Sequence, residues 1–435
     1  MRMTLAMSDI NIQVPILARV EGEGALDLSI RDGSIHSLKL KIFEPPRLFE
    51  KFLVGRHADE LPDLVARICG ICPVAYQMSA VHAIESLADF KRPAWLHDLR
   101  RLFYCGEWIE SHSLHIHLLA APDFLGFSNV IDMAKEHPEA VNRGLTLQAI
   151  GNDIIRTLGA RSVHPVGVKM GGFHQLPSQQ SLNTLLSSIE KSIPAAEALL
   201  TWCISLDRPH YESTLPSVSL SSHGEYPINQ GNIISSEGLN IPLEDYEKHF
   251  QENQVAHSTA LHSHLKGQPY LLGPLARVNL NFDQLPSKIH ATLAQHGYTV
   301  PNHNMFDNMV ARAIELLYAL HESKRIIETV DLTHTQVDPI EFKAGTAIGC
   351  TEAPRGLLWH RYEIDKAGYI EQAKLVPPTS QNQAHIEHSL ITGLTAFGLT
   401  RPTKDIKQYA EQMIRNYDPC ISCATHFLKL NIEYD

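Results

Sequence analysis

The chain has 435 residues, of which 44% are hydrophobic, so it can bury the core of two or three average domains or of one large domain. Its formal net charge of -11 and the lack of any basic block argue against nucleic acid and anionic membrane surfaces as partners. No apolar run reaches the roughly 20 residues of a membrane span, and residues 1–10 lack the apolar core of a signal peptide. We therefore expect a cytoplasmic protein.

Residues 10–43 alternate apolar and polar side chains, which is typical of strands, and Asp32-Gly33 is a hairpin signal. We predict a small antiparallel sheet over this segment. In its first bend, residues 19–24 place acids, among them Glu21, in a glycine-rich turn. Turn chemistry alone explains that bend without any function.

Residues 44–206 are predicted to form a helical core that contains the first cysteine pair. A short helix over 47–54 carries Glu50, and Leu61-Pro62 opens a further turn of helix. Apolar residues at helical spacing predict longer helices over 74–90, 95–119, 138–158 and 178–206. The glycine-rich loop 164–172 lacks the Gly-Lys-Ser/Thr ending of a phosphate-binding loop, so we expect no nucleotide there.

Three histidines in the second of these long helices, His112, His115 and His117, stand at positions i, i+3 and i+5. A metal site is conceivable at this spacing, but the same spacing is common in helix cores. We favour structural histidines, because a four-cysteine site elsewhere already supplies a full ligand set.

Residues 207–301 are weakly patterned and are predicted to be a peripheral elaboration. The segment 302–426 contains the second cysteine pair. We predict an amphipathic helix over 302–330 and a hairpin that starts at 352–356, with strands over 357–364 and 369–376. Two further helices are predicted over 384–397 and 403–416. Because no linker interrupts the chain, we expect residues 1–435 to form one large catalytic domain. The predicted class is α+β, mainly α, with a central bundle of long helices and small antiparallel sheets near both ends.

Two Cys-x-x-Cys pairs, Cys69/Cys72 and Cys420/Cys423, stand near opposite ends of the chain. If the fold brings them together they form one four-thiolate metal site, and a structural zinc site is the default alternative. Charged and imidazole side chains within three residues of the thiols favour a functional centre: Arg67, Asp418 and His426. The other cysteines, Cys105, Cys203 and Cys350, are predicted to be buried thiols, which suits a reducing compartment.

The motif Arg-x-Cys-Gly-x-Cys early in the chain, with Asp-Pro-Cys-x-x-Cys-x-x-His at its end, resembles the large subunit of nickel-iron hydrogenases. The resemblance extends from about Arg19 to His426. Residues 422–426 are more similar to the soluble NAD(P)-linked and sulfhydrogenase group than to membrane-bound uptake enzymes. The resemblance implies a bidirectional enzyme that cleaves dihydrogen heterolytically into protons and electrons.

The resemblance also implies a role for each ligand. Cys69 and Cys420 match thiolates that bind nickel alone, and Cys72 and Cys423 match the pair that bridges nickel and iron. The iron of this family carries carbon monoxide and cyanide as further ligands. A separate magnesium or iron site is implied for three groups: the Glu50 side chain, the Leu375 main-chain carbonyl and the His426 imidazole.

Further positions match groups around the metals. Arg355 matches the arginine over the open metal position, and Pro354 and Thr379 match positions near the cyanides. Asp418 matches an acid that orients Arg355, and Glu21 matches the glutamate that takes a proton from the Cys420 sulfur. One departure is Ser111, where many membrane-bound relatives have an aspartate, so any role of that acid is absent or relocated.

The four paired cysteines leave no spare ligands for iron–sulfur clusters, so electrons are expected to leave through a partner. The implied partners are an iron–sulfur small subunit, diaphorase-type subunits that bind flavin and NAD(P), and a maturation endopeptidase. That endopeptidase would remove residues 427–435 after His426, although the apolar tail residues leave retention open. The competing hypothesis is a non-catalytic, zinc-stapled structural subunit derived from a hydrogenase.

Overall fold

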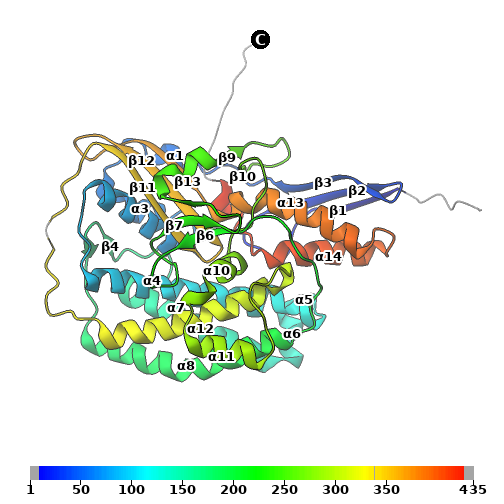
Figure 1. The fold of residues 1–435 in the computed structure, drawn as a ribbon, viewed down its shortest axis with the longest axis horizontal. Coiled ribbons are helices and arrows are strands. Elements are labelled where there is room, and N and C mark those ends of the chain that lie inside the picture. The colour runs from blue at the N-terminus through cyan, green and yellow to red at the C-terminus, as the bar shows by residue number, and fades with distance from the viewer. Residues whose placement is uncertain (1–8, 338, 426–435) are drawn as a thin grey trace, which may run out of the picture.

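The computed structural model describes residues 9–337 and 339–425, so the predictions for His426 and for the tail 427–435 lie outside the described residues. A bundle of long helices lies on one side of the molecule and consists of α4 (Ala94–Leu114), α7 (Pro138–Gly159), α8 (Gln179–Ser205) and α12 (Asn308–Thr329) (Figure 1). The small sheets lie on the other side together with the remaining long helices, α3 (Pro73–Leu87), α13 (Pro378–Phe397) and α14 (Thr403–Asn416). The predicted α+β class, mainly α, is confirmed.

Shorter elements complete the first half of the chain: α1 (Phe49–Leu53), α2 (Leu61–Val65), a π-helical turn (His115–Ala120), α5 (Ala121–Leu125), α6 (Val130–Glu136), β4 (Val168–Lys169) and β5 (Gly172–Phe173). Single 3-10 turns occur at Ala58–Glu60, Leu243–Asp245, Phe282–Gln284, Met305–Asp307 and Ser422–Thr425. Among the described residues, none of the helices combines the length and the apolar composition needed to cross a membrane.

The N-terminal sheet has the antiparallel order β1 (Ile10–Val14), β2 (Gly24–Arg31) and β3 (Ser34–Ile42). Its hairpin forms at the predicted position, because Asp32 and Gly33 both adopt the positive φ angles that a tight turn requires. In Figure 1 this sheet projects beside α13 and α14, so the two ends of the chain lie together. A metal site with ligands from both ends of the chain requires this arrangement.

The second sheet has three strands, β11 (Gly345–Ala353), β12 (Gly356–Ile364) and β13 (Ile370–Val376), where the sequence predicted only the last two. β11 was missed because its sequence is rich in small and polar residues. The physical reason is the close approach of α3. A Cβ on Gly349 would lie 2.2 Å from the carbonyl oxygen of Ser79, so this position accepts only glycine.

Two helix predictions need correction. α13 begins at Pro378 and not near residue 384, because proline at the first helical position needs no hydrogen-bond acceptor; Thr379 therefore lies in a helical turn. The helix predicted as amphipathic, α12, is buried on every side over residues 308–320, because it packs between α4 and α8. Its apolar stripe was real, but its other faces are buried as well.

The segment 207–301 forms β6 (Val218–Ser221), β7 (Asn232–Ser235), β8 (Asn240–Ile241), α9 (Tyr246–His249), β9 (Phe250–Asn253), β10 (His262–Leu265), α10 (Pro274–Asn281) and α11 (Ser287–Gln295). The prediction of a peripheral elaboration is wrong for part of it. Arg277 of α10 is fully buried between Glu315 of α12 and Glu352 of β11. This segment thus supplies a charged group to the interior.

Candidate metal centre

The two Cys-x-x-Cys pairs lie together although about 350 residues separate them, because the chain ends are joined by backbone contacts. Glu21 and Cys420 form a parallel bridge, and the Ile421 N–H donates to the Glu21 carbonyl at 3.0 Å. Arg47 ties the pairs further. Its Nη2 donates to the carbonyl of Ile68 at 2.6 Å and also to that of Ser422.

The four sulfur atoms lie within 4.8 Å of one another, and all four cysteines are buried. Across the pairs, Cys69 Sγ lies 3.5 Å from Cys420 Sγ, and Cys72 Sγ lies 3.6 Å from Cys423 Sγ. All seven cysteines of the chain are free thiols, and Cys105, Cys203 and Cys350 are buried, as predicted. The structure therefore brings the predicted thiol set into one cluster.

The first pair is shaped by a turn that runs into a helix. The N–H groups of Ile71 and Cys72 donate to Cys69 Sγ at 3.3 and 3.2 Å. Pro73 then opens α3, whose free N–H groups at Val74 and Ala75 donate to the buried carboxylate of Glu107 on α4. Glu107 thus fixes the start of α3 directly behind Cys72.

The second pair follows α14 through a sharp change in direction. Asp418 adopts a φ of 55°, a left-handed conformation that aspartate tolerates better than most residues. The Cys420 N–H then donates to Thr379 Oγ1 at 3.0 Å. Thr379 is therefore placed at the thiols by the early start of α13.

Arg355 lies in the turn between β11 and β12 and is held by Asp418. Its Nε donates to the Asp418 carbonyl at 2.6 Å, and its Nη2 donates to Asp418 Oδ1 at 3.0 Å. Ser111 accepts only a long contact of 3.4 Å from Arg355 Nη1. The other carboxylate oxygen of Asp418 lies 3.3 Å from Arg312 Nη1. Asp418 therefore contacts both Arg355 and Arg312.

The electrostatics of the cluster follow from burial and crowding. Hydrogen bonds, first from Cys420 and then from Cys423, hold the pKa of the Cys69 thiol well below its usual value. Contact with Cys423 and Cys69 raises the pKa of Cys420, since a second thiolate so close is unfavourable. Burial alone would raise the pKa of Asp418, but the Arg355 guanidinium lowers it. The site therefore accepts several thiolates only together with positive charge.

The cation that faces the thiols is Arg355. Arg67, which stands beside the first pair in the sequence, has an exposed side chain. Proximity in sequence did not translate into proximity in space, because the turn before Cys69 directs Arg67 outward.

Glu21 is the carboxylate closest to the thiols. Its Oε2 accepts from the Cys420 S–H at 3.0 Å and from the Ser422 N–H at 3.1 Å. A thiol and a carboxylate at this distance can exchange a proton.

A small cavity, too narrow to admit a water molecule, lies against the thiols. Its lining residues come from both chain ends and from the second sheet: Cys72, Tyr76, Ala353, Arg355, Leu358, Pro378, Thr379, Cys420 and Cys423. Arg355 and Thr379 thus both line the cavity beside the thiols. Pro354 is in the same turn, between two lining residues. Tyr76, Leu358 and Pro378 were not foreseen, because no local pattern distinguishes them from ordinary core residues.

Two of the three residues predicted to bind a second cation are in contact with each other. Glu50 Oε1 accepts from the Leu375 N–H at 2.7 Å, so α1 and β13 bring these residues into contact. The third predicted ligand, His426, lies outside the described residues.

The three histidines of the long helix do not converge on a common metal position. This agrees with the prediction that they are structural. His112 Nε2 contacts Glu315 at 2.9 Å, His115 Nε2 contacts the Arg415 carbonyl at 2.8 Å, and His117 Nδ1 contacts the Ser113 carbonyl at 2.9 Å. Each ring therefore has its own partner among the described residues.

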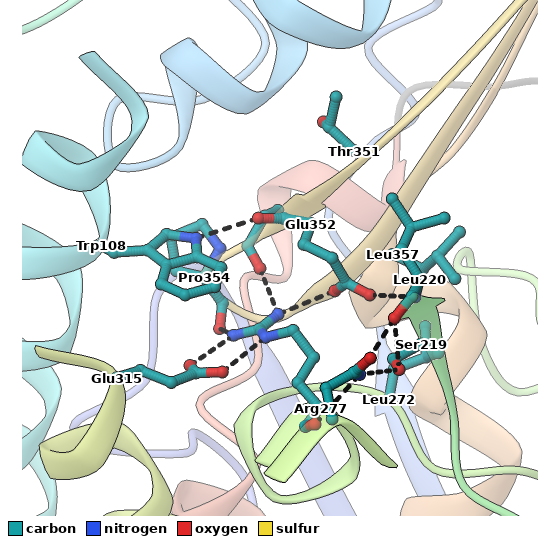
Figure 2. Close-up of polar contacts among 12 residues, drawn as sticks. Trp108, Ser219, Leu220, Leu272, Arg277, Glu315, Thr351, Glu352, Pro354 and Leu357 are labelled. Atoms are coloured by element: carbon teal, nitrogen blue, oxygen red, sulfur yellow. Dashed lines mark hydrogen bonds and ion pairs between the residues drawn. The ribbon is translucent and has the colours of Figure 1, made fainter. Parts of the chain in front are cut away.

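A buried charge network supports the Arg355 turn (Figure 2). Arg277 makes two bonds of 2.7 Å to Glu315 and one of 2.9 Å to Glu352. It also donates to the carbonyls of Ala353 and Pro354 at 2.7 and 3.0 Å. Those carbonyls directly precede Arg355, so Arg277 fixes the turn that presents it. No sequence pattern indicated this network, because Arg277 lies in the weakly patterned segment.

The donor set fits a soft transition metal. Four buried sulfurs, one guanidinium and a small closed cavity suit nickel and iron, which thiolates bind well. Several buried thiolate charges need positive charge nearby. Among the described residues Arg355 supplies part of this charge, and a bound metal ion would supply the rest.

Comparisons with known proteins agree with this chemistry. Residues 47–185 and 233–426 match the family model described as nickel-dependent hydrogenase. The chain is 32% identical to sulfhydrogenase 1 subunit alpha of Pyrococcus furiosus over 97% of its length and 100% of that relative. It is 27% identical to the NAD-reducing hydrogenase HoxS subunit beta of Cupriavidus necator, over 95% of this chain and 94% of that one.

A solved structure of an NAD+-reducing [NiFe]-hydrogenase in the H2-reduced state superposes with a TM-score of 0.86. The sequence identity is 26%, and the match covers 97% of this chain and 100% of that one. The arrangement of helices and sheets is therefore that of nickel-iron hydrogenase large subunits.

The Arg277 network leads to a prediction on stability. Lysine in place of Arg277 keeps the charge but offers at most three donors, so buried acceptors on Glu315, Glu352 or the turn lose their partners. We expect Arg277→Lys to lower the free energy of unfolding by about 2 kcal/mol, which thermal or denaturant unfolding measures. Arg325→Lys, at an exposed arginine that is also paired with a glutamate, should change it by less than about 0.5 kcal/mol. Equal effects of the two substitutions would contradict the network's role.

Proposed function

Because the chain belongs to the nickel-dependent hydrogenase family, we propose that it is the catalytic subunit of a bidirectional enzyme that cleaves dihydrogen reversibly and heterolytically. The observation that carries this proposal is the convergence of four buried thiols, a carboxylate and a guanidinium around one enclosed cavity. The rival, a zinc-stapled structural subunit, would not need Glu21 or Arg355 at the sulfurs.

The thiols would hold a nickel-iron group whose iron carries carbon monoxide and cyanide. We propose that Cys69 and Cys420 bind nickel alone and that Cys72 and Cys423 bridge the two metals. When bound, this group supplies the redox and electrophilic chemistry that splits dihydrogen. Thr379 and Pro354 are proposed to lie near the cyanides, and Thr379 lines the cavity in support of this.

Glu21 is proposed to receive the proton that leaves the reaction. Its Oε2 lies 3.0 Å from the Cys420 sulfur, within hydrogen-bond reach. Beyond it, the Ser422 hydroxyl donates to Glu44 Oε1 at 3.3 Å, which offers a second carboxylate on the same side of the site. The same carboxylates would deliver protons when the enzyme produces dihydrogen.

Arg355 is proposed to keep a fixed positive charge at the cavity, where charge separates during cleavage. Asp418 holds it through two hydrogen bonds, so the planar guanidinium cannot rotate freely. Such preorganised charge is effective because the cavity is buried.

Several wider proposals rest on the relatives. The P. furiosus and C. necator relatives are named as subunits, so we propose an iron–sulfur small subunit as partner, and diaphorase-type subunits that pass electrons to NAD(P) or a similar carrier. Full dihydrogen-dependent dye reduction by the isolated, metallated chain would argue against this partner.

We propose that Glu50, the Leu375 carbonyl and His426 hold magnesium or iron, and that a maturation endopeptidase removes residues 427–435. The intact mass of active enzyme tests that cleavage.

We also propose that residues 1–435 act as one catalytic domain in the cytoplasm. One continuous hydrophobic core that runs from the N-terminal sheet to Cys423 supports the first point. The free thiols at all seven cysteines support a reducing compartment.

The decisive experiment is metal analysis combined with infrared spectroscopy of the protein purified from its native host. We expect one nickel per chain and infrared bands of carbon monoxide and cyanide. Zinc at the thiols without such bands would overturn the proposed function and favour the structural subunit.

For Glu21→Gln we expect metal content to stay unchanged and deuterium–hydrogen exchange to fall by about 100-fold or more. The amide keeps the size and hydrogen bonding of the side chain but removes its titrating group. Glu23→Gln, an exposed acid two residues away in the same bend, is the matched control and should exchange at the parent rate. Exchange by Glu21→Gln at that rate as well would rule out the proposed proton role.

For Arg355→Lys we expect turnover to fall by about 100-fold, with most of the nickel retained. The charge remains, but the planar fork that Asp418 holds is lost. Arg361→Lys, at a partly exposed arginine on the neighbouring strand β12, should leave turnover unchanged. Wild-type turnover in a fully metallated Arg355→Lys enzyme would count against the proposed role.

A further inference from the structure

A second cluster of metal-binding side chains lies away from the four thiols. It consists of His257 in the loop before β10, His262 at the start of β10, and Glu387 on α13. One ligand atom from each residue lies within 4.8 Å of the others. Two segments far apart in the chain, residues 257–262 and α13, thus place two imidazoles and a carboxylate close together.

The carboxylate of Glu387 stands between the two rings. Its Oε1 lies 2.8 Å from His257 Nε2, and its Oε2 lies 3.9 Å from His262 Nδ1, beyond hydrogen-bond range. The two rings are nearly perpendicular, with an interplanar angle of 87° and centroids 5.8 Å apart. If the three side chains moved slightly closer together, one ligand atom from each would lie about 2.0–2.2 Å from a metal ion at the centre of the cluster, which is the usual distance for zinc ligands.

His262 has the features of a ligand. It is 4% exposed, and its Nε2 is buried without a hydrogen-bond partner in the described part of the chain. Burial, and after it His257 and His264, lowers the pKa of His262 to about 4, so at neutral pH the ring is uncharged. A neutral ring cannot form an ion pair with Glu387, but it is the form of histidine that binds a metal.

We propose that His257, His262 and Glu387 bind one divalent transition metal of the zinc class, separately from the thiol centre. Two imidazoles and one carboxylate suit zinc, whereas magnesium prefers oxygen ligands alone. The side chains of His257 and Glu387 are 20% and 16% exposed, so water can reach the remaining coordination positions.

The position of this site indicates a structural role. The Leu40 N–H of β3 donates to Glu387 Oε1 at 2.8 Å, and the Thr259 N–H donates to the Ile42 carbonyl at 2.8 Å. The loop that carries His257 therefore lies on β3, and its Ala260 packs against Ile421, between the thiols of the second pair. On α13, Glu387 follows Thr379 by eight residues, about 12 Å along the helix. The metal would clamp this loop, the N-terminal sheet and α13 behind the catalytic cavity.

The test uses the purified holoenzyme, treated with a chelator, dialysed against zinc and analysed for zinc and nickel per chain. We expect Glu387→Gln to lose one zinc per chain while nickel stays constant, because the amide can still accept from Leu40 but is a poor metal ligand. His262→Asn should lose the same zinc. His223→Gln, at an exposed histidine outside the cluster, should keep it. Added zinc should raise the melting temperature of the wild type and not that of Glu387→Gln.

A nickel content equal to that of the wild type shows that a variant has folded. If a variant does not fold, His257→Asn, at a partly exposed position, is tested in its place. Cobalt(II) offers a second readout, because bound imidazole and carboxylate give visible bands without the strong thiolate charge-transfer bands of the cysteine site. Equal zinc content in the wild type and Glu387→Gln would overturn the proposal. Failure of the wild type to bind one zinc per chain would do the same and leave a histidine–carboxylate hydrogen bond only.

Discussion

The structure depends on the meeting of two cysteine pairs from opposite ends of the chain. Bringing residues so distant in sequence together costs chain entropy that the sulfurs alone cannot offset. The N-terminal sheet, α13 and α14 supply the compensating burial. Arg47 bonds to both cysteine pairs, and Glu21 bonds the N-terminal segment to the second pair. The metal centre therefore needs almost the entire fold, which explains why the relatives match this chain over nearly its full length.

Burying several thiolates imposes a second constraint, because each charge taken out of water must be compensated nearby. Arg355 faces the sulfurs, Asp418 holds Arg355, and Arg312 lies behind Asp418. Arg277 continues this pattern one layer further, between Glu315 and Glu352. Its guanidinium outweighs burial and lowers the pKa of Glu315 to about 2, whereas burial raises that of Glu352 to about 7. The interior around the cavity is thus a chain of alternating charges, and it fixes Arg355 through its backbone as well as its side chain.

The elements that the sequence missed share one cause. β11, the first turns of α13 and the buried faces of α12 are enclosed by other elements on several sides. A segment with one exposed face shows an alternating or helical pattern, but a segment that is covered all round does not. Gly349 illustrates this, since its lack of a side chain reflects contact with α3 and says nothing about its strand. For the same reason, Arg277 in a weakly patterned segment could not be recognised as an interior group.

The sequence by itself determined the ligand chemistry and the family, because Cys-x-x-Cys spacing and its flanking residues are local and specific. It also indicated Asp418 through its place beside the second pair. Glu21, Arg355 and Thr379 were indicated only through resemblance, since none of them stands out in its own segment. The tertiary structure decided which charges face the sulfurs, replacing Arg67 by Arg355, and it revealed Arg47, Glu107 and Arg277 as supports. It also brought together His257, His262 and Glu387. These contacts join residues far apart in the chain, and a pattern read along one segment contains no information about which distant segment will pack against it.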